Sequence, residues 1–329
     1  MGDGTPRVTV IVPVHNRRPL VRQLLDALAA QTYRDFEVAV VDDGSTDGAP
    51  DEVESDRAAG RRVRSLANTG SGAVAARRTG VAASASTYLA FTDSDCVPAP
   101  GWLAAGVAAL DAGADVVNGT TRPARPVALH ERSLASGEEG LYPTCNVFYR
   151  RQAYDAAGGF DLEAAARLGF RPWARARGLG FGEDTILAWK VRRAGRAAYV
   201  PEAVVEHAVF PLELGDLVSR TVQMAAFPAL VREVPELRGM PLFRHRYVLG
   251  NSSRLPLYVS IFAAGIGRRH AAAASLAAWA VIQVRRGRLA DAEPAPTAFA
   301  TGMALRLGLD AVAAGALVVG SLRSRTLVL

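Results

Sequence analysis

The segment Thr87-Tyr88-Leu89-Ala90-Phe91-Thr92-Asp93-Ser94-Asp95 decides the fold, because an apolar strand ends there in two carboxylates one residue apart. Residues two apart on an extended chain point to the same face, so Asp93 and Asp95 can project together. At the carboxyl end of a buried strand they would lie in the crevice where α/β sheets bind ligands. Two hard oxygen ligands suit a divalent cation on a diphosphate. The pair alone fits equally well a turn that caps a helix before Pro98 and Pro100.

Strand-like and helix-like patterns alternate through about residue 210, which predicts an α/β protein. Strands are predicted at residues 8–14, 36–41, 61–66, 87–91, 114–117, 146–150 and 198–200, and helices at 20–31, 72–83 and 183–193. Such alternation favours a Rossmann-like, mostly parallel sheet with helices on both faces. From residue 144 the pattern is irregular, as expected of chain that builds over a sheet edge.

Polar residues follow the first, second and fourth predicted strands. Because parallel strands end at one edge of a sheet, these residues should converge in the geometry of a nucleotide site. They are Pro13, His15, Asn16, Asp42, Asp43, Asp93 and Ser94. The loop from Asn68 to Gly72 then opens an Ala-rich helix, and Arg77 sits on its next turn. This loop lacks a third glycine and follows the third strand, which disfavours a dinucleotide-dependent dehydrogenase.

A second acidic pair, Glu183-Asp184, opens a later predicted helix. Acids in a first turn complement the helix dipole, which explains the pair without any function. Alternatively, one carboxylate serves as a general base at the mouth of the site. His207 follows a strand, and a lone histidine is more often structural than a ligand. Beside a two-Asp motif it could complete a metal shell.

The composition is that of an ordinary globular protein with a basic balance. The 329 residues are 50% hydrophobic and 21% charged, and the net charge is +6. Lys190 is the only lysine, so nearly all the positive charge is Arg, which binds phosphate in bidentate fashion. The arginines are spread out without interleaved aromatic residues, so we expect no nucleic-acid binding. Cys96 and Cys145 form no disulfide framework, and the polar start predicts no signal peptide; we expect a cytoplasmic protein.

The chain becomes helical and strongly apolar after about residue 212, which predicts two regions, 1–211 and 212–329. Apolar runs at 255–264, 271–284 and 311–319 fall short of the roughly 18 to 20 uninterrupted residues that span a bilayer. Arginine clusters punctuate the runs. The pattern fits a packed helical subdomain, helices lying in the interface of an anionic membrane, or two short or re-entrant spans.

Taken together, the motifs resemble those of family 2 glycosyltransferases, which are inverting enzymes of the GT-A fold. The matching segments, in family order and spacing, are 8–17, 40–48, 68–80, 93–95, 182–184 and His207. The resemblance covers about residues 7–210. It implies a nucleotide-sugar-binding and catalytic domain at 1–211, followed by a helical extension at 212–329 that contacts a membrane in one interpretation.

Carried over residue by residue, the resemblance assigns the donor site. It implies that Asp42 contacts the donor base and Asp93 the ribose, with Arg77 near the base or pyrophosphate. Asp95, together with Asp93, would hold Mn²⁺ or Mg²⁺ on the diphosphate, and His207 is a further ligand in this assignment. The donor would be a UDP, dTDP or GDP sugar.

The resemblance also implies that Asp184, beside Glu183, deprotonates the acceptor hydroxyl. Two departures leave details open. Arg78 stands where the family often has Asn, which bears on donor choice. Thr185 follows Asp184, which bears on acceptor geometry.

We therefore predict a metal-dependent, inverting glycosyltransferase that acts on a glycan or lipid-linked acceptor of the cell envelope, with the inner face of the plasma membrane as its working place. Inverting transfer needs one base and one stabilised leaving group, and no enzyme nucleophile. Two alternatives remain. One is a non-catalytic nucleotide-binding scaffold of the same fold. The other is a sugar nucleotidyltransferase, disfavoured because His15-Asn16-Arg17-Arg18 replaces the Gly-rich, Lys-bearing loop of such enzymes.

Overall fold

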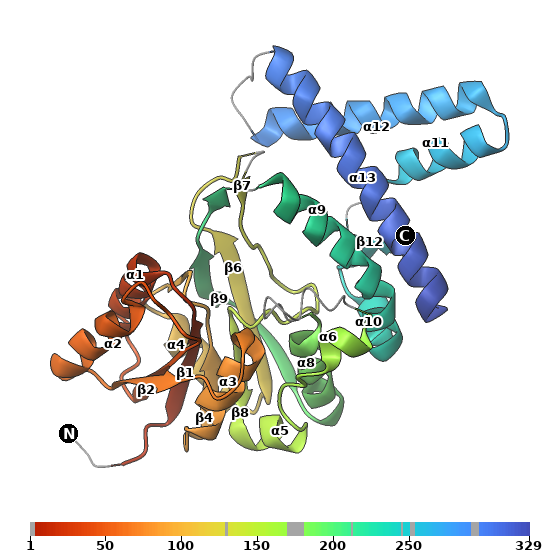
Figure 1. Cartoon of the computed structure of the whole chain (residues 1–329). Helices are drawn as coiled ribbons and strands as arrows, with labels where there is room; N and C mark the ends of the chain where they lie inside the picture. Colours follow the sequence, from red (N-terminus) through yellow and green to blue (C-terminus); the bar gives the residue numbers. More distant parts are fainter. Residues whose placement is uncertain are drawn as a thin grey trace. The chain divides into compact units, whose positions relative to one another are not determined.

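The computed structural model describes residues 4–128, 131–169, 181–211, 213–244, 246–250, 254–290 and 296–329. The chain divides into two compact units (Figure 1). The first combines Met1–Ala124 with Ser133–Ala208, and the second combines Arg125–Arg132 with Val209–Leu329. The second unit thus takes a short excursion from the first half of the chain as well as the apolar C-terminal region.

The first unit is built on an eight-stranded sheet of order β3-β2-β1-β4-β8-β6-β9-β5. The strands are β1 (Val8–Val14), β2 (Phe36–Asp42), β3 (Val63–Ala67), β4 (Tyr88–Phe91), β5 (Cys96–Pro98), β6 (Val116–Pro123), β8 (Val147–Arg150) and β9 (Ala197–His207). Strands β3, β2, β1 and β4 are parallel, as are β6 and β9, whereas β8 and β5 run antiparallel to their neighbours. The predicted α/β fold class is confirmed.

The structure corrects the predicted place of one strand. Strand β8 does not build over an edge; it lies inside the sheet between β4 and β6. Its residues Val147, Phe148 and Tyr149 are all buried, because helices cover both of its faces. Strand β5 was not predicted at all, since three residues ending in proline carry almost no periodicity.

Helices cover both faces of this sheet (Figure 1). They are α1 (Arg18–Ala29), α2 (Ala49–Ala58), α3 (Gly72–Ala82), α4 (Trp102–Asp111), α5 (Arg151–Ala156), α6 (Ala164–Arg167) and α8 (Glu183–Ala194). On one face, alternate β1 residues such as Val10 join Leu24 of α1 and Trp102 of α4 in the main core. On the other face, α3 packs so closely that a Cβ on Gly80 would lie 2.6 Å from Ile11 Cγ2.

An aromatic cluster packs against the end of β4, directly before the acidic residues that follow it. Phe91 makes an edge contact with Tyr149, with ring centroids 5.9 Å apart, and another with Phe160 at 5.2 Å. Tyr154 stacks on Phe91 at 6.1 Å. Close-packed aromatic rings fix the strand end, so the backbone that carries the next four residues starts from a rigid base.

The second unit is mainly helical. Its elements are β7 (Glu131–Arg132), β10 (Phe210–Pro211), α9 (Leu214–Gln223), η1 (Met224–Ala226), α10 (Phe227–Glu233), η2 (Pro235–Gly239), β11 (Phe243–Arg244), β12 (Val248–Leu249), α11 (Leu255–Gly265), α12 (Arg269–Ala290) and α13 (Pro296–Ser324). Helix α13 packs against α9, η1 and α10, and α11 packs along α12.

A polar cluster around Asp310 joins α13 to the other two long helices. Its Oδ1 accepts from Arg254 Nε at 2.7 Å, directly before α11. Its Oδ2 accepts from Trp279 Nε1 of α12 at 3.0 Å and from Gln283 Nε2 at 3.2 Å. The Asp310 side chain is only 14% exposed, so the charge is compensated by these donors rather than by water.

Helix α13 is longer than the apolar run that suggested it. One segment, Gly302–Ser324, is long and apolar enough to cross a membrane by length and composition, with a mean hydropathy of 1.6. The sequence expectation counted only uninterrupted apolar residues. Arg306 and Asp310 interrupt this segment, so a longer helix of apolar composition lay outside that count. Length and composition alone also fit a helix that packs within a protein.

We expect Asp310→Ala to loosen the second unit. The substitution leaves Arg254, Trp279 and Gln283 without their shared acceptor, at a cost of about 1–3 kcal/mol. Hydrogen exchange of the α11, α12 and α13 amides should speed up, while the β1 and β4 amides keep their protection. Asp310→Asn retains one oxygen acceptor and should show a smaller effect. Equal exchange in all three proteins would show that the cluster contributes nothing.

Candidate functional site

The carboxyl ends of β1, β2 and β4 lie at one edge of the sheet, since the three strands are parallel neighbours. In the register, Val14 pairs with Asp42 and Ile11 with Phe91. The polar residues that follow each strand therefore share this edge. The sequence pattern placed them on separate strands, and the pairing brings those strands together.

The turn from β1 into α1 carries two non-glycine residues with positive φ. Asn16 has φ 50° and Arg17 has φ 101°, a costly conformation for a residue with a side chain. The neighbouring loop holds the turn in place. The N–H of Asn16 donates to Ser45 Oγ at 2.8 Å, its Oδ1 accepts from the Thr46 N–H at 2.9 Å, and Asp47 accepts from the Arg17 N–H.

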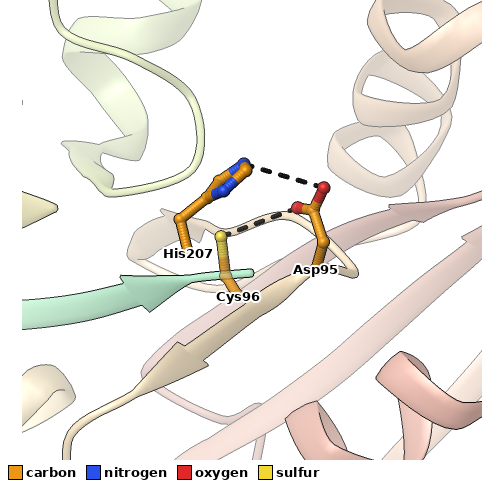
Figure 2. Close-up of side chains that lie close together, drawn as sticks. All are labelled: Asp95, Cys96 and His207. Carbon is orange, nitrogen blue, oxygen red and sulfur yellow. Dashed lines mark hydrogen bonds and ion pairs between the residues drawn. The ribbon is translucent and has the colours of Figure 1, made fainter. Parts of the chain in front are cut away.

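This turn directs the Arg17 guanidinium onto Asp95, where Nη1 donates to Oδ2. The His207 Nε2 lies 3.7 Å from the same carboxylate oxygen, and Cys96 Sγ lies 3.8 Å from the other one (Figure 2). Cys96 of β5 and His207 of β9 are register partners, which explains why residues so distant in sequence meet. The Asp95 side chain is 12% exposed, so its charge depends on these neighbours.

The hydrogen bonds of His207 leave one ring nitrogen turned to Asp95. Its Nδ1 lies 2.8 Å from the Ala208 carbonyl oxygen, which can only accept, so Nδ1 carries the proton. A neutral ring then has its lone pair on Nε2. A backbone carbonyl on the second nitrogen is the usual way to orient a metal-binding histidine.

The side chains around Asp95 fit a divalent cation. Asp95, Cys96 and His207 each offer a ligand atom within 4.8 Å of one another. A carboxylate and a neutral imidazole suit Mn²⁺ or Mg²⁺ with further oxygen ligands. The hydrogen bond with Cys145 and burial raise the pKa of the Cys96 thiol, so it stays protonated and is a poor ligand. A guanidinium already bound to Asp95 shows that the carboxylate attracts a cation.

Arg77 is a buried cation at the centre of the acidic residues. Its Nη2 donates to Asp93 Oδ1 at 2.6 Å, and only 6% of its side chain is exposed. Burial alone would lower the pKa of Arg77, but the negative charges of Asp93, Glu183 and Asp184 outweigh it and raise that pKa. Arg77 therefore stays charged, binds Asp93 and lies close enough to Glu183 and Asp184 to feel their charge.

The second acidic pair begins α8 after Gly182, whose φ of 77° favours glycine. Glu183 is buried, and its Oε2 has no hydrogen-bond partner among the residues that the structure describes. Asp184 is only half-buried, and its Oδ1 accepts from the Thr185 N–H at 2.7 Å. The Thr185 hydroxyl donates to the Leu141 carbonyl at 2.6 Å, which fixes the start of the helix. Thr185, a departure from the family pattern, is thus an anchor of α8.

Burial, and then the charge of Glu183, raise the pKa of Asp184 to about 7. Burial also raises the pKa of Glu183. A carboxyl group with a pKa near 7 is ionised in part at neutral pH and accepts a proton more readily than an ordinary aspartate. Among the two, Asp184 has the greater access to solvent, and hence to a bound molecule.

The remaining predicted residues lie nearby, several of them in structural contacts. Asp42 accepts from the Ser45 N–H at 3.0 Å and so closes its own turn. Asp43 accepts from Asn68 Nδ2 at 2.7 Å and from the Gly72 N–H at 2.8 Å, which ties β2 to the start of α3. The His15 ring meets the Asp43 carbonyl oxygen at 2.9 Å. Pro13 and Ser94 are buried. Their part in binding stays a prediction.

Sequence reasoning missed Arg17 and Cys96 as members of the site. Arg17 was included in the family-like segment 8–17 and in the segment that lacks a nucleotidyltransferase loop, but no role in the site was assigned to it. Its position depends on a positive φ, for which a non-glycine residue gives no sequence signal. Cys96 directly follows Asp95, and that adjacency was the available clue. The helix-capping alternative for the first acidic pair is not realised, since α4 begins after Gly101 without a side-chain cap.

Fold and site together define an α/β protein with a cation-attracting acidic site at the carboxyl edge of its parallel strands. Residues 9–164 match the family model described as "Glycosyl transferase family 2". The chain carries a family 2 glycosyltransferase region, and its first unit has the GT-A fold.

Several known proteins that are similar to this chain are named glycosyltransferases. Glycosyltransferase AglE of Haloferax volcanii is 37% identical over 49% of this chain and 58% of its own length. The pre-mycofactocin glycosyltransferase of Mycobacterium tuberculosis is 34% identical over 63% of this chain and 43% of its own. The chain thus spans about half the length of these curated relatives.

A solved structure shows the same fold. The mannosyltransferase PcManGT from Pyrobaculum calidifontis, in complex with GDP-Man and Mn²⁺, aligns with a TM-score of 0.56 and 23% identity. The alignment covers 98% of this chain and 88% of the neighbour.

We expect Asp184→Asn to stabilise the fold above pH 7. The raised pKa means that ionising Asp184 costs folding free energy. The cost is absent below the unfolded pKa near 4, grows as the pH rises to about 7, and is constant above. The amide removes it, so the variant should unfold at least about 2–4 °C higher at pH 8, in thermal melts, for a gain of about 1 kcal/mol.

The same melts at pH 4 supply the control, because wild type and Asp184→Asn should then unfold alike. Asp155→Asn changes an aspartate whose side chain is 55% exposed and should shift the melting temperature little at either pH. If the variant melts below wild type at pH 8, the ionised Asp184 carboxylate does not destabilise the folded state.

Proposed function

We propose that this protein transfers a sugar from a nucleoside diphosphate donor to an acceptor hydroxyl with inversion at the anomeric carbon. The observation that carries the proposal is the shared sheet edge, where Asp95 attracts a cation and Arg77 holds Asp93 near the Glu183–Asp184 pair. The cation that Asp95 attracts suits a charged leaving group, and the Glu183–Asp184 pair supplies a base. Inverting transfer needs both and needs no enzyme nucleophile.

Asp184 is the base in this proposal. A pKa of about 7 lets it take the proton of an incoming hydroxyl at neutral pH, and its residue keeps some access to solvent, and so to a bound acceptor. Glu183 supports it from the buried side. Its carboxylate charge is one of the causes that raise the pKa of Asp184. The bond of Asp184 to the Thr185 N–H fixes the carboxylate orientation.

In this proposal Asp95 and His207 hold the metal. Asp93, which the sequence also assigned to it, is not among the ligand atoms that lie within 4.8 Å of one another and is paired with Arg77. Mn²⁺ or Mg²⁺ bound there would neutralise the charge that grows on the departing nucleoside diphosphate. PcManGT, which shares the fold, was solved with Mn²⁺, and this supports the choice of a divalent ion. The Nδ1–H of His207 donates to the Ala208 carbonyl, and its Nε2 lies 3.7 Å from Asp95 Oδ2.

The donor lies along the carboxyl ends of β1, β2 and β4 in this proposal. Asp42 would accept from the base, and Asp93, held by Arg77, from the ribose. Pro13, His15 and Asn16 line the first strand end. A UDP, dTDP or GDP sugar suits such a site, and GDP-Man in PcManGT is one member of that class.

In this proposal the acceptor is a hydroxyl group of a glycan or of a lipid-linked sugar. Transfer takes place on the cytoplasmic side of a membrane. The basic, apolar helices of the second unit support this assignment. A non-catalytic scaffold would bind the donor but never release its sugar, and no observation favours it over an enzyme.

We expect Asp184→Asn to bind donor like wild type but to lose transfer by at least about 100-fold, because the acceptor proton has no base. In wild type, kcat/KM should fall about tenfold per pH unit below pH 7, as Asp184 becomes protonated. Release of nucleoside diphosphate from UDP-, dTDP- and GDP-sugars, with a soluble glycoside acceptor, measures both effects. Asp155→Asn is the matched control. Transfer by Asp184→Asn at the wild-type rate would exclude Asp184 as the base.

We expect Arg17 and Mn²⁺ to compete for Asp95. Arg17→Gln removes the cation that occupies Oδ2, so Mn²⁺ should bind about tenfold more tightly in the absence of donor. Asp95→Ala should abolish this binding. Titration followed by the electron paramagnetic resonance of free Mn²⁺ measures both. Unchanged Mn²⁺ affinity in Arg17→Gln would show that the two cations do not share the carboxylate.

A further inference from the structure

Helices α11 and α12 form an antiparallel hairpin in the second unit, and we use the name hairpin for residues 255–285 (Figure 1). Gly267, with φ 77°, lies in the turn, and the Ser260 hydroxyl donates to the Ala272 carbonyl at 2.8 Å. The Asp310 cluster holds the other end through Arg254 and Trp279. The hairpin is therefore a defined element with fixed faces.

Large apolar side chains of this hairpin are exposed. Phe262 is 68% exposed, Ile266 54%, and both Val259 and Ile261 53%. On α12, Leu276 and Val281 are exposed as well. An apolar surface of this extent is costly in water and marks a contact with another apolar medium.

The charged side chains that the hairpin and its flanking sequence carry are all arginines. Between residues 237 and 290 the sequence has nine arginines and no aspartate or glutamate. Arg268, Arg269 and Arg285 are exposed at its two ends. A second copy of this chain would bring the same positive charge to the contact and be repelled. An anionic lipid surface offers both an apolar layer and the complementary charge.

The spacing of the arginines also decides the orientation. The uncharged stretch of α12 from residue 271 to 284 is about 21 Å long as a helix, shorter than the hydrocarbon core of about 30 Å. Arginines at both ends of this stretch belong at the level of the lipid head groups. An apolar stretch that is too short to cross the hydrocarbon core, with cations at both ends, is suited to lie along the interface.

We propose that the hairpin docks the protein on anionic bilayers, with α11 and α12 parallel to the membrane plane. The apolar side chains Val259, Ile261, Phe262 and Ile266 enter the boundary between head groups and acyl chains. Arg268, Arg269 and Arg285 bind lipid phosphates. This inference deepens the proposed use of a membrane-side acceptor, but it concerns binding alone and needs neither donor nor transfer.

Sedimentation with vesicles of phosphatidylcholine, with or without phosphatidylglycerol, tests the proposal on the full chain. Wild type should bind the anionic vesicles, and added salt should weaken the binding. Ile261→Asp combined with Phe262→Asp should reduce it at least tenfold. Arg268→Ser combined with Arg269→Ser should reduce the preference for anionic lipid. Leu162→Asp, which changes a side chain 48% exposed in the first unit, should bind like wild type.

Melting temperatures establish that each variant is folded, since all substituted side chains are exposed. Equal binding to neutral and anionic vesicles, or full binding by the Ile261/Phe262 variant, overturns the proposal; the latter would transfer the role to α13. A dimer that the same variant dissociates, with no vesicle binding by wild type, assigns the surface to a second copy. Vesicle binding without any transfer to a soluble acceptor would instead count against the proposed function and leave the hairpin proposal intact.

Discussion

The buried Arg77 cation is the interaction on which the site depends. One guanidinium compensates Asp93 directly and lowers the cost of placing Glu183 and Asp184 nearby. Without it, three carboxyl groups would be concentrated in a mostly dry region, where each charge disfavours the others. The compensation is incomplete, and the remaining imbalance appears as the raised pKa of Asp184. The ionised form of Asp184 is therefore tolerated at the expense of stability.

The second cation, Arg17, is positioned by a strained backbone turn and is less buried than Arg77. Its φ of 101° is maintained by the contacts of the 45–47 loop with the β1–α1 turn. Strain of this kind persists where the surrounding structure over-determines it, and it clusters at functional sites. Arg77 thus binds Asp93, and Arg17 binds Asp95, in the Asp93-Ser94-Asp95 segment. One cation is permanent, and the other sits where an exchangeable ion is proposed to bind.

The two units of the chain solve the burial of polar groups differently. The first places its charges at the edge of a sheet, next to close-packed aromatic rings. The second gathers one acidic residue, Asp310, with donors from two other elements inside a helical unit, and its segment 237–290 carries arginines without any aspartate or glutamate. A helix that holds a compensated aspartate can still be apolar by composition, which is why counting uninterrupted apolar residues missed the length of α13.

The sequence by itself determined the α/β class, most strands, the acidic segments and their order, because hydrophobic periodicity and strand-end polarity are local properties. It also contained Glu183-Asp184 and His207, although it could not weigh them against helix capping or a structural histidine. Only the tertiary structure decided that β8 lies inside the sheet, that β5 pairs Cys96 with His207, and that Arg17 reaches Asp95. These features depend on strand order and on a positive φ, which are set by packing between distant segments and leave no periodic signal in the sequence.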